Sequence, residues 1–352
     1  MQPYFILVRR SFILVFFSLV LSCDDPSSGQ PRHEDETFTN PVLTSAPDPW
    51  VIQQGDFYYV TYTTGNNLKL IRTSEMSELS QGEVRTIWSP PAGGPGSKNI
   101  WAPELHFIQG KWYYYYAADD GQNENHRMWV LENSHPDPFQ GTWTEKGEVA
   151  LPDDKWAIDG TIAERNGELY FLWSGWDGDV NVQQNIYICK MANPWTAVGE
   201  RIRLSQPDFA WEKSGGPPYV NEAPQWLTHD DEIFITYSAS GCWTDEYSLG
   251  LMTTDVTADL LNPDSWNKSN EPIFTKNESS LAFGPGHNSF FKSKDGTEDW
   301  LTYHANDASG AGCGDDRSMR MQKFTWENGR PFFGTPVALG LSLSVPSGED
   351  ED

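Results

Sequence analysis

Basic residues are scarce in this sequence. Its 352 residues include 24 Lys and Arg against 50 Asp and Glu, which gives a formal net charge of −26. Because contacts to nucleic-acid phosphates need Lys and Arg, this balance excludes a nucleic-acid-binding function. The mean hydropathy of −0.56 excludes a membrane protein with many spanning segments. Aromatic residues are plentiful, at 14% of the chain, and this content excludes a disordered protein.

One apolar segment stands at the N-terminus. Arg9 and Arg10 precede the run FILVFFSLVLS, and a positive region followed by a short apolar run is typical of a secretory signal peptide. The run is too short to span a membrane comfortably as an anchor. Residues 20–23, with the sequence VLSC, resemble a bacterial lipobox, which implies a lipid on Cys23 and a protein anchored at the outer membrane or cell surface. The alternative is ordinary cleavage and a periplasmic or secreted protein.

Cysteine is also scarce, with four residues in all, and no CxxC motif or Cys/His cluster predicts a zinc site. Cys189 lies in the apolar run IYICKM and is expected to be buried as a small hydrophobic residue. Cys242 and Cys313 lie in Gly-rich loops after strand-like runs. In an exported protein these two either form a disulfide or stay free, and their spacing alone does not decide between the two.

An aromatic strand-like run recurs five times, at intervals of about 60 residues. The five runs are FYYVTYTT from Phe57, WYYYYAAD from Trp112, LYFLWSGW from Leu169, IFITYSAS from Ile233 and WLTYHAND from Trp300. Each is rich in β-forming residues and ends at small or turn residues. No long helical periodicity accompanies them. The chain is therefore expected to be all-β.

A second, shorter segment precedes each aromatic run and carries an acid or a histidine beside Pro or Gly. These segments are APDPWVI with Asp48, WAPELHFI with Glu104, AIDGTIA with Asp159, NEAPQWL with Glu222 and GPGHNSFF with His287. A turn sequence such as QQGD or RNGE joins each segment to its run, which indicates a hairpin. Five such repeats, each with further strand-like segments, predict a five-bladed β-propeller.

The repeats also suggest how the chain is divided. Residues 1–22 are expected to be the signal segment, 23–38 a flexible acidic tether, 39–342 the propeller and 343–352 an acidic tail. In a propeller the first strand of each blade lies nearest the axis, so the five segment heads should converge at one end of the central channel. Several carboxylates brought together there would be costly to desolvate, and such a cost is typical of a functional site.

A group of carboxylates in an aromatic-lined pocket favours glycoside hydrolysis. In that reaction one carboxylic acid protonates the leaving oxygen, while a second carboxylate activates water or attacks the sugar. A third nearby carboxylate can raise the pKa of the acid by like-charge repulsion. Trp and Tyr offer flat apolar faces to the C–H side of a sugar.

The five motifs APDPW, WAPELH, AIDGT, NEAPQ and GPGHNS, in this order and spacing, resemble the blade motifs of glycoside hydrolase family 43. The resemblance covers about residues 40–339. It implies a five-bladed propeller and an inverting enzyme that acts on arabinan, arabinoxylan or xylo-oligosaccharides. By motif, it implies that Asp48 is the general base and Glu222 the general acid, and that Asp159 orients the acid and tunes its pKa. An inverting enzyme then requires the carboxyls of Asp48 and Glu222 to lie about 6.5–9.5 Å apart.

The resemblance extends to residues around the carboxylates. It places Trp101 at the pocket wall and Arg317 opposite the sugar at the cleavage site, with Arg320 as the competing arginine. Glu104 would act structurally or behind the residues that touch the sugar. His287 matches a histidine on the propeller axis, which implies a calcium ion or an ordered water nearby; no cofactor is required for the chemistry itself.

The finer sequence pattern resembles the family members that release terminal α-L-arabinofuranose, so an arabinose-containing oligo- or polysaccharide is the expected substrate and a monomer the expected state. A β-xylosidase or an endo-arabinanase of the same family is the alternative activity. A non-catalytic, glycan-binding surface lipoprotein is the alternative of another class, and a structural propeller that binds a protein is a third.

Overall fold

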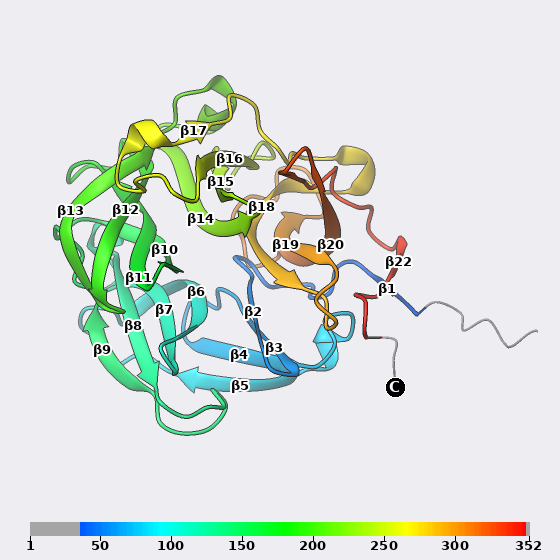
Figure 1. Cartoon of the computed structure of the whole chain (residues 1–352), viewed down its shortest axis with the longest axis horizontal. Coiled ribbons are helices and arrows are strands. Elements are labelled where there is room, and N and C mark those ends of the chain that lie inside the picture. The colour runs from blue at the N-terminus through cyan, green and yellow to red at the C-terminus, as the bar shows by residue number, and fades with distance from the viewer. Residues whose placement is uncertain (1–35, 350–352) are drawn as a thin grey trace, which may run out of the picture. The chain divides into compact units, whose positions relative to one another are not determined.

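Five four-stranded antiparallel β-sheets form the part of the chain that the structure describes, residues 36–349 of a computed structural model (Figure 1). The expected signal segment and Cys23 lie outside the described residues. The first sheet holds β2 (Trp50–Gln54), β3 (Phe57–Thr61), β4 (Leu68–Thr73) and β5 (Glu83–Trp88). The second holds β6 (Lys98–Ile108), β7 (Lys111–Asp119), β8 (Arg127–Asn133) and β9 (Thr144–Glu148). The third holds β10 (Ala157–Arg165), β11 (Glu168–Trp176), β12 (Gln183–Asn193) and β13 (Thr196–Ser205).

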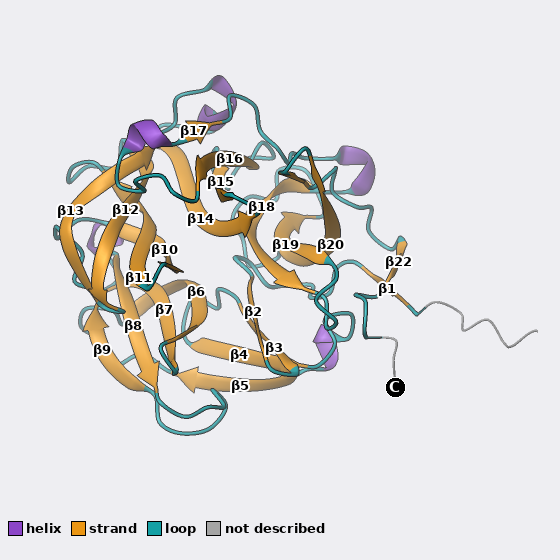
Figure 2. Ribbon diagram, viewed as in Figure 1, coloured by secondary structure: helices purple, strands orange, loops and turns teal. Residues whose placement is uncertain are grey.

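The fourth sheet holds β14 (Tyr219–His229), β15 (Glu232–Ala239), β16 (Ser248–Asp255) and β17 (Asn267–Lys268). The fifth holds β18 (Phe283–Lys292), β19 (Asp299–Asn306), β20 (Ser318–Glu327) and β21 (Arg330–Phe332). A short parallel pairing of β12 with β14 joins the third sheet to the fourth. The helical segments among the described residues are single 3₁₀ turns, drawn purple in Figure 2: η1 (Leu79–Gln81), η2 (Asn123–Asn125), η3 (Ala210–Lys213), η4 (Pro263–Ser265) and η5 (Glu278–Ser280).

The sheets are arranged as blades around an axis. The first strands contact one another in a closed ring, β2 with β6, β6 with β10, β10 with β14, β14 with β18 and β18 with β2. Figure 1 shows these strands innermost and the later strands of each sheet toward the outside. The prediction of an all-β, five-bladed β-propeller is confirmed. The five aromatic runs form the second strands β3, β7, β11, β15 and β19, as the repeat predicted.

The hydrophobic core is divided into five layers, one between each pair of neighbouring blades. The run WYYYYAAD shows why the second strands are so aromatic. Along β7, Trp112, Tyr114 and Tyr116 face the layer shared with the first blade, and Tyr113 and Tyr115 face the layer shared with the third. Because side chains alternate across a strand, a strand between two layers must be large and apolar at every position.

The two ends of the described chain pair with each other. Strand β1 (Thr37–Thr39) runs antiparallel to β22 (Ser342–Ser344). Phe38 is buried, and the carboxylate of Glu349 accepts hydrogen bonds from the backbone N–H groups of Met76 and Ser77 at 2.7 and 3.1 Å. The folded body therefore extends beyond the expected limits of 39 and 342 on both sides.

Candidate active site

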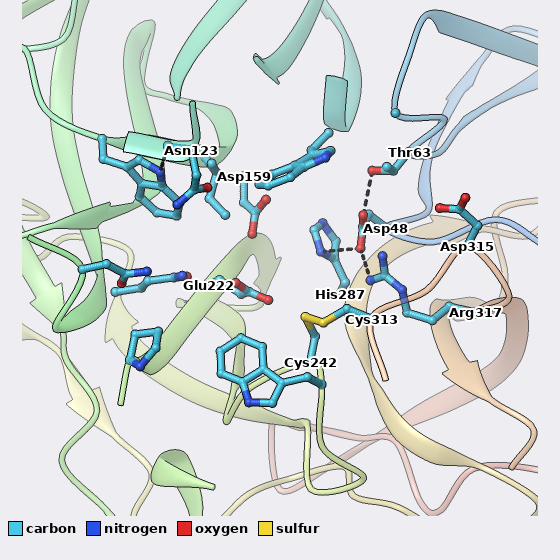
Figure 3. A pocket seen from close by; sticks show the side chains of 18 residues that line it. Asp48, Thr63, Asn123, Asp159, Glu222, Cys242, His287, Cys313, Asp315 and Arg317 are labelled. Carbon is cyan, nitrogen blue, oxygen red and sulfur yellow. Dashed lines mark hydrogen bonds and ion pairs between the residues drawn. A yellow bond between two sulfur atoms is a disulfide. The ribbon is translucent and has the colours of Figure 1, made fainter. Parts of the chain in front are cut away.

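A pocket of about 390 Å³ opens at one end of the propeller axis, and residues from all five blades line it. Those from the first two blades are Asp48, Thr63, Gly65, Trp101 and Asn123; those from the third are Trp156, Ile158, Asp159, Asn181 and Gln184; and those from the last two are Pro218, Glu222, Cys242, Trp243, His287, Cys313, Asp315 and Arg317. Figure 3 shows the carboxyl groups of Asp48, Asp159 and Glu222 turned toward the same space.

The same backbone device builds this pocket in every blade. One residue at the head of each first strand has a left-handed backbone, with φ between 41° and 57°, and these residues are Asp48, Ala102, Asp159, Ala223 and His287. In β6, β10, β14 and β18 the pairing with the second strand shifts register at this point. A bulge of this kind ends regular pairing and re-aims side chains, and left-handed non-glycine residues cluster at functional sites.

Neighbouring blades support four of these strained residues. The backbone N–H of each donates to a side chain of the preceding blade: Ala102 to Thr63 at 2.7 Å, Ala223 to Asp159 at 3.1 Å, His287 to Ser238 at 2.8 Å and Asp48 to His304 at 3.1 Å. The site is therefore held by contacts around the ring, not by any one blade.

The bulge also decides which sequence-predicted residues meet. Asp48, Asp159 and His287 occupy the left-handed position itself, whereas Glu222 precedes it by one residue, and all four line the pocket. Glu104 follows the left-handed residue of its blade by two positions and does not line the pocket.

Glu104 instead contacts two buried polar side chains, those of Gln225 and His106. Gln225, two positions after the left-handed residue of the fourth blade, donates to it at 2.6 Å, and His106 contacts its other oxygen at 2.8 Å. Glu104 thus converges toward the axis with the other heads but does not line the pocket. Its supporting role behind the residues that touch the sugar stays a prediction.

Asp48 is surrounded by donors. Its Oδ1 lies 2.8 Å from Nη1 of Arg317 and 3.2 Å from Nδ1 of His287, and its Oδ2 accepts from the hydroxyl of Thr63 at 2.6 Å. Burial alone would raise the pKa of Asp48, but the charges of Arg317 and His287 hold that pKa well below its usual range. Asp48 is thus ionised at neutral pH, and its backbone N–H donates to a His304 ring whose own pKa is lowered to about 3 by burial.

Asp159 and Glu222 lie in the opposite kind of environment. Both are buried, and the partners that contact them are a backbone N–H for Asp159 and the hydroxyl of Tyr247, which donates to Glu222 at 2.7 Å. Burial is the largest cause that raises the pKa of both carboxyls, and the negative charge of Asp48 adds to it. Two neighbouring acids of this kind titrate as a pair, and the pair holds a proton to higher pH than exposed carboxyls do.

His287 lies between the two kinds of carboxyl (Figure 3). Burial would lower the pKa of His287, but the charges of Asp48 and Asp159 raise it to about 9. A protonated imidazole does not ligate a metal, and calcium prefers oxygen donors that are free of competing cations. Within residues 36–349, no group of three or more His, Cys, Asp or Glu side chains is placed to hold a metal ion.

Arg317 and Arg320, the two competing arginines, lie in different places. Arg317 lines the pocket and contacts Asp48. Arg320 is fully buried elsewhere, where it donates to Asp307 at 2.6 Å and to the backbone oxygen of Leu281 at 2.8 Å. The geometry favours Arg317 as the arginine of the site.

Aromatic rings line part of the pocket wall. Trp101 stacks on His126 with ring centres 4.1 Å apart, and Trp156 stacks on Trp176 at 4.7 Å. Trp101 lines the pocket, and its contact with a sugar stays a prediction. Trp156 was not anticipated, although it precedes the AIDGT motif directly.

Three supporting residues also escaped the sequence analysis: Thr63, His304 and Tyr247. Thr63 and His304 belong to the five aromatic runs, and their polar character within those runs is the signal that marks them. Tyr247 stacks on His304 with ring centres 5.6 Å apart and an interplanar angle of 8°. Nothing in the local sequence marks Tyr247 as a partner of Glu222.

The structure answers the question of the cysteines. Cys242 and Cys313 form a disulfide with Cα atoms 5.3 Å apart, and both line the pocket. Cys189 is a free, buried thiol in the layer between the second and third blades, as expected.

Comparison with known proteins agrees with this geometry. The family model described as "Glycosyl hydrolases family 43" matches residues 38–331. An extracellular exo-α-(1→5)-L-arabinofuranosidase of Streptomyces avermitilis is 38% identical over 95% of this chain and 72% of its own. A second enzyme of that name, from Streptomyces chartreusis, is 41% identical over 76% and 82% of the two chains. The crystal structure of an α-L-arabinofuranosidase from Lactobacillus brevis superposes with a TM-score of 0.81 at 36% identity, covering 86% of this chain and 98% of that one.

Proposed function

Because the chain belongs to glycosyl hydrolase family 43, we propose that it releases terminal α-L-arabinofuranose from arabinan or arabino-oligosaccharides with inversion at the anomeric carbon. One observation carries the assignment of roles. Within a single pocket, the pKa of Asp48 is lowered while those of Glu222 and Asp159 are raised. Pairs of carboxyls whose environments push their pKa values apart mark the base and the acid of a hydrolase.

The reaction is a single displacement. Ionised Asp48 takes a proton from a water molecule as the oxygen of that water bonds to the anomeric carbon. Protonated Glu222 donates its proton to the glycosidic oxygen as the bond between that oxygen and the anomeric carbon breaks. The products are free arabinose of inverted configuration and the shortened glycan. After this step Asp48 is protonated and Glu222 is ionised, and proton exchange with solvent returns both to their starting states.

The other pocket residues support these two. Asp159 lies beside Glu222, and because both carboxyls are buried, the pair keeps a proton at neutral pH. Arg317 and His287 keep Asp48 ionised and aim its carboxylate. We propose that Arg317 also faces the terminal sugar and that Trp101 offers it an apolar wall, because both line the pocket.

The names of the relatives support arabinose as the sugar that is released, and a product profile tests it. Purified protein is incubated with linear arabinan, branched arabinan, arabinoxylan and xylo-oligosaccharides, and the configuration of the first product is followed by NMR. We expect free arabinose of inverted anomeric configuration. Release of xylose would indicate a β-xylosidase, and release of longer oligomers an endo-arabinanase. Binding without turnover would indicate a glycan-binding protein.

Export and attachment form a separate part of the proposal. The two Streptomyces relatives are described as extracellular, and the N-terminal sequence of this chain resembles a lipoprotein signal. We propose that the protein is exported and anchored through a lipid on Cys23, as a monomer. Cells fed a labelled fatty acid should yield labelled protein, and a Cys23→Ser variant should not. Among residues 36–349, no helix has both the length and the apolar character to cross a membrane.

Calcium remains a secondary hypothesis. A calcium ion near His287 would be held by this side chain directly or through water. Dialysis against EDTA tests this: a fall in the melting temperature that added calcium restores would support the ion, and an unchanged melting temperature would exclude it.

A further inference from the structure

An exposed tryptophan stands at the rim of the pocket. Trp243 lines the pocket and is 42% exposed, whereas Asp48, Asp159, Glu222 and His287 are at most 9% exposed. Trp243 therefore lies at the mouth, while the carboxylates lie at the inner end. The exposed part of this indole is available to a ligand at the pocket mouth, and covering it would be favourable.

The indole is held in one place by its own surroundings. Its Nε1 donates to the backbone oxygen of Gly215 at 2.9 Å. A Cβ atom at Gly215 would come within 2.6 Å of the ring, and one at Gly241 within 2.3 Å. Both positions must be glycine for the indole ring to pack there. One side of the ring therefore contacts the backbone of Gly215 and Gly241, and the other side is exposed to solvent.

The loop that carries Trp243 is tied to the neighbouring blade. Residues 240–247 connect β15 to β16, and residues 307–317 connect β19 to β20. The Cys242–Cys313 disulfide joins the two loops next to Trp243. Asp245 adds two hydrogen bonds, accepting from the backbone N–H of Gly310 at 2.8 Å and from the hydroxyl of Ser309.

This loop also begins and ends beside the proposed acid. Just before the loop, Ser238 of β15 pairs with Glu222 in the β14–β15 ladder. At its end, Tyr247 donates its hydroxyl to Glu222. The group that receives a proton from Glu222 is the leaving sugar, and Trp243 stands on the loop between these two contacts, in the lining of the same pocket.

On the basis of the proposed function, we propose that Trp243 is the stacking platform for the sugar on the leaving side of the cleaved bond. The Cys242–Cys313 disulfide is the positioning element that holds this platform over the pocket mouth. The flat, apolar face of the indole suits the C–H face of a furanose, and the hydrogen bond of its Nε1 to Gly215 leaves that face free of polar groups.

Substitution of Trp243 tests the platform. Two ligands are compared: 1,5-linked arabinotriose, which reaches the leaving side, and methyl α-L-arabinofuranoside, which replaces the leaving sugar by a methyl group. We expect Trp243→Ala to raise the KM for arabinotriose about tenfold, which corresponds to about 1.4 kcal/mol. The inhibition constant of the methyl glycoside should change less than about twofold, and Trp243→Phe should recover part of the lost affinity.

The matched control is Phe332→Ala, which removes an exposed aromatic ring from β21, outside the pocket lining. It should change neither constant. An unchanged KM in Trp243→Ala, or an equal loss for both ligands, would overturn the platform.

The disulfide is tested by a Cys242→Ser, Cys313→Ser double variant. We expect a raised KM for arabinotriose and little change in the inhibition constant of the methyl glycoside. Dithiothreitol should raise the KM of the wild type in the same way and leave the double variant unchanged. Equal constants in the wild type and the double variant would show that the disulfide does not position the platform.

These results are separable from the proposed function. If the wild type fails to release arabinose from arabinotriose, the proposed function and the platform both fall. If the wild type does release it and Trp243→Ala behaves like the wild type, the platform alone falls.

Discussion

The chemistry of the site depends on small differences around three buried carboxyls. Asp48 has an arginine, a histidine and a hydroxyl as partners, whereas Glu222 has the hydroxyl of Tyr247. The pKa of the same kind of group is therefore lowered in one position and raised in another, because the local charges and donors differ while the burial is similar.

The proposed acid makes a prediction about leaving groups. In Glu222→Ala, kcat/KM on arabinotriose should fall about 10²- to 10⁴-fold, because a poor leaving oxygen needs a proton. On dinitrophenyl arabinofuranoside, whose leaving group departs without a proton, the loss should be much smaller. Asp48→Asn is the matched comparison, and it should lose activity on both substrates, since both need an activated water. Equal losses for Glu222→Ala on the two substrates would remove Glu222 as the acid.

The pH profile gives a second prediction at this scale. Activity requires ionised Asp48, and because the pKa of Asp48 is lowered, the acidic limb of kcat/KM should lie below about pH 4. The alkaline limb reports loss of the proton from the Asp159–Glu222 pair. The hydroxyl of Tyr247 lowers the pKa of Glu222, so Tyr247→Phe should move the alkaline limb to higher pH.

Tyr303→Phe is the control for that shift, because Tyr303 is equally buried and donates to Gln322, away from the carboxyls. Its profile should match the wild type. An alkaline limb that stays in place or moves to lower pH in Tyr247→Phe would contradict the role given to the Tyr247 hydroxyl.

At the scale of single elements, the bulge at the head of each first strand is the device that creates the site. It places Asp48, Asp159 and His287 in left-handed conformations and sends Glu104 away from the pocket. The second strands contribute the packed support, since their aromatic residues pack on both faces of each blade. A site held to fractions of an ångström needs both, a local distortion and a stiff support.

Asn40 supplies a prediction for one strand. Its side chain accepts from the backbone N–H of Met321 at 2.9 Å and donates to the backbone oxygen of Met321 at 2.8 Å, so it pairs with β20 as another strand would. Asn40→Ala would leave two buried backbone groups without a partner, at a cost of about 2 kcal/mol or more. Urea unfolding should show this loss, whereas Asn270→Ala, at an exposed side chain, should show almost none. Equal stabilities of the two variants would contradict the account.

At the scale of the whole molecule, the propeller is a ring of five blades, and a hydrophobic layer lies between each pair of neighbouring blades. Four of the five left-handed residues donate to the blade before them, so the geometry of the site depends on closure of the ring. The pairing of β1 with β22 and the contact of Glu349 with the first blade bring the two ends of the described chain together.

Glu349 makes this closure testable. Glu349→Ala removes two charge-assisted hydrogen bonds to the backbone of Met76 and Ser77, and we expect the free energy of unfolding to fall by about 2 kcal/mol. Chemical denaturation measures the change. Glu327→Ala, at an exposed glutamate of β20, is the control and should stay within about 0.5 kcal/mol of the wild type. A loss as small in Glu349→Ala would mean that this contact does not stabilise the ring.

The sequence by itself determined the number and kind of the blades. A strand between two apolar layers must be aromatic or aliphatic at every position. The strand β7 and its four counterparts can therefore be recognised in the sequence from WYYYYAAD and the similar runs. The charged or histidine residues in the segments before these runs can be recognised as well, because a polar side chain beside a buried apolar strand differs from its neighbours. This is why Asp48, Asp159, Glu222 and His287 were found together.

Only the tertiary structure decided the rest. Whether Glu104 lines the pocket depends on its position, two residues after the left-handed residue of the bulge. The motif WAPELH by itself does not show where the bulge lies. Whether Cys242 reaches Cys313, and whether Tyr247 reaches Glu222, depends on how two loops from neighbouring blades meet. The lowered pKa of Asp48 depends on Arg317, which is 269 residues away from it in the chain. Contacts of that kind are made by folding, since local sequence carries periodicity but not the distance between remote residues.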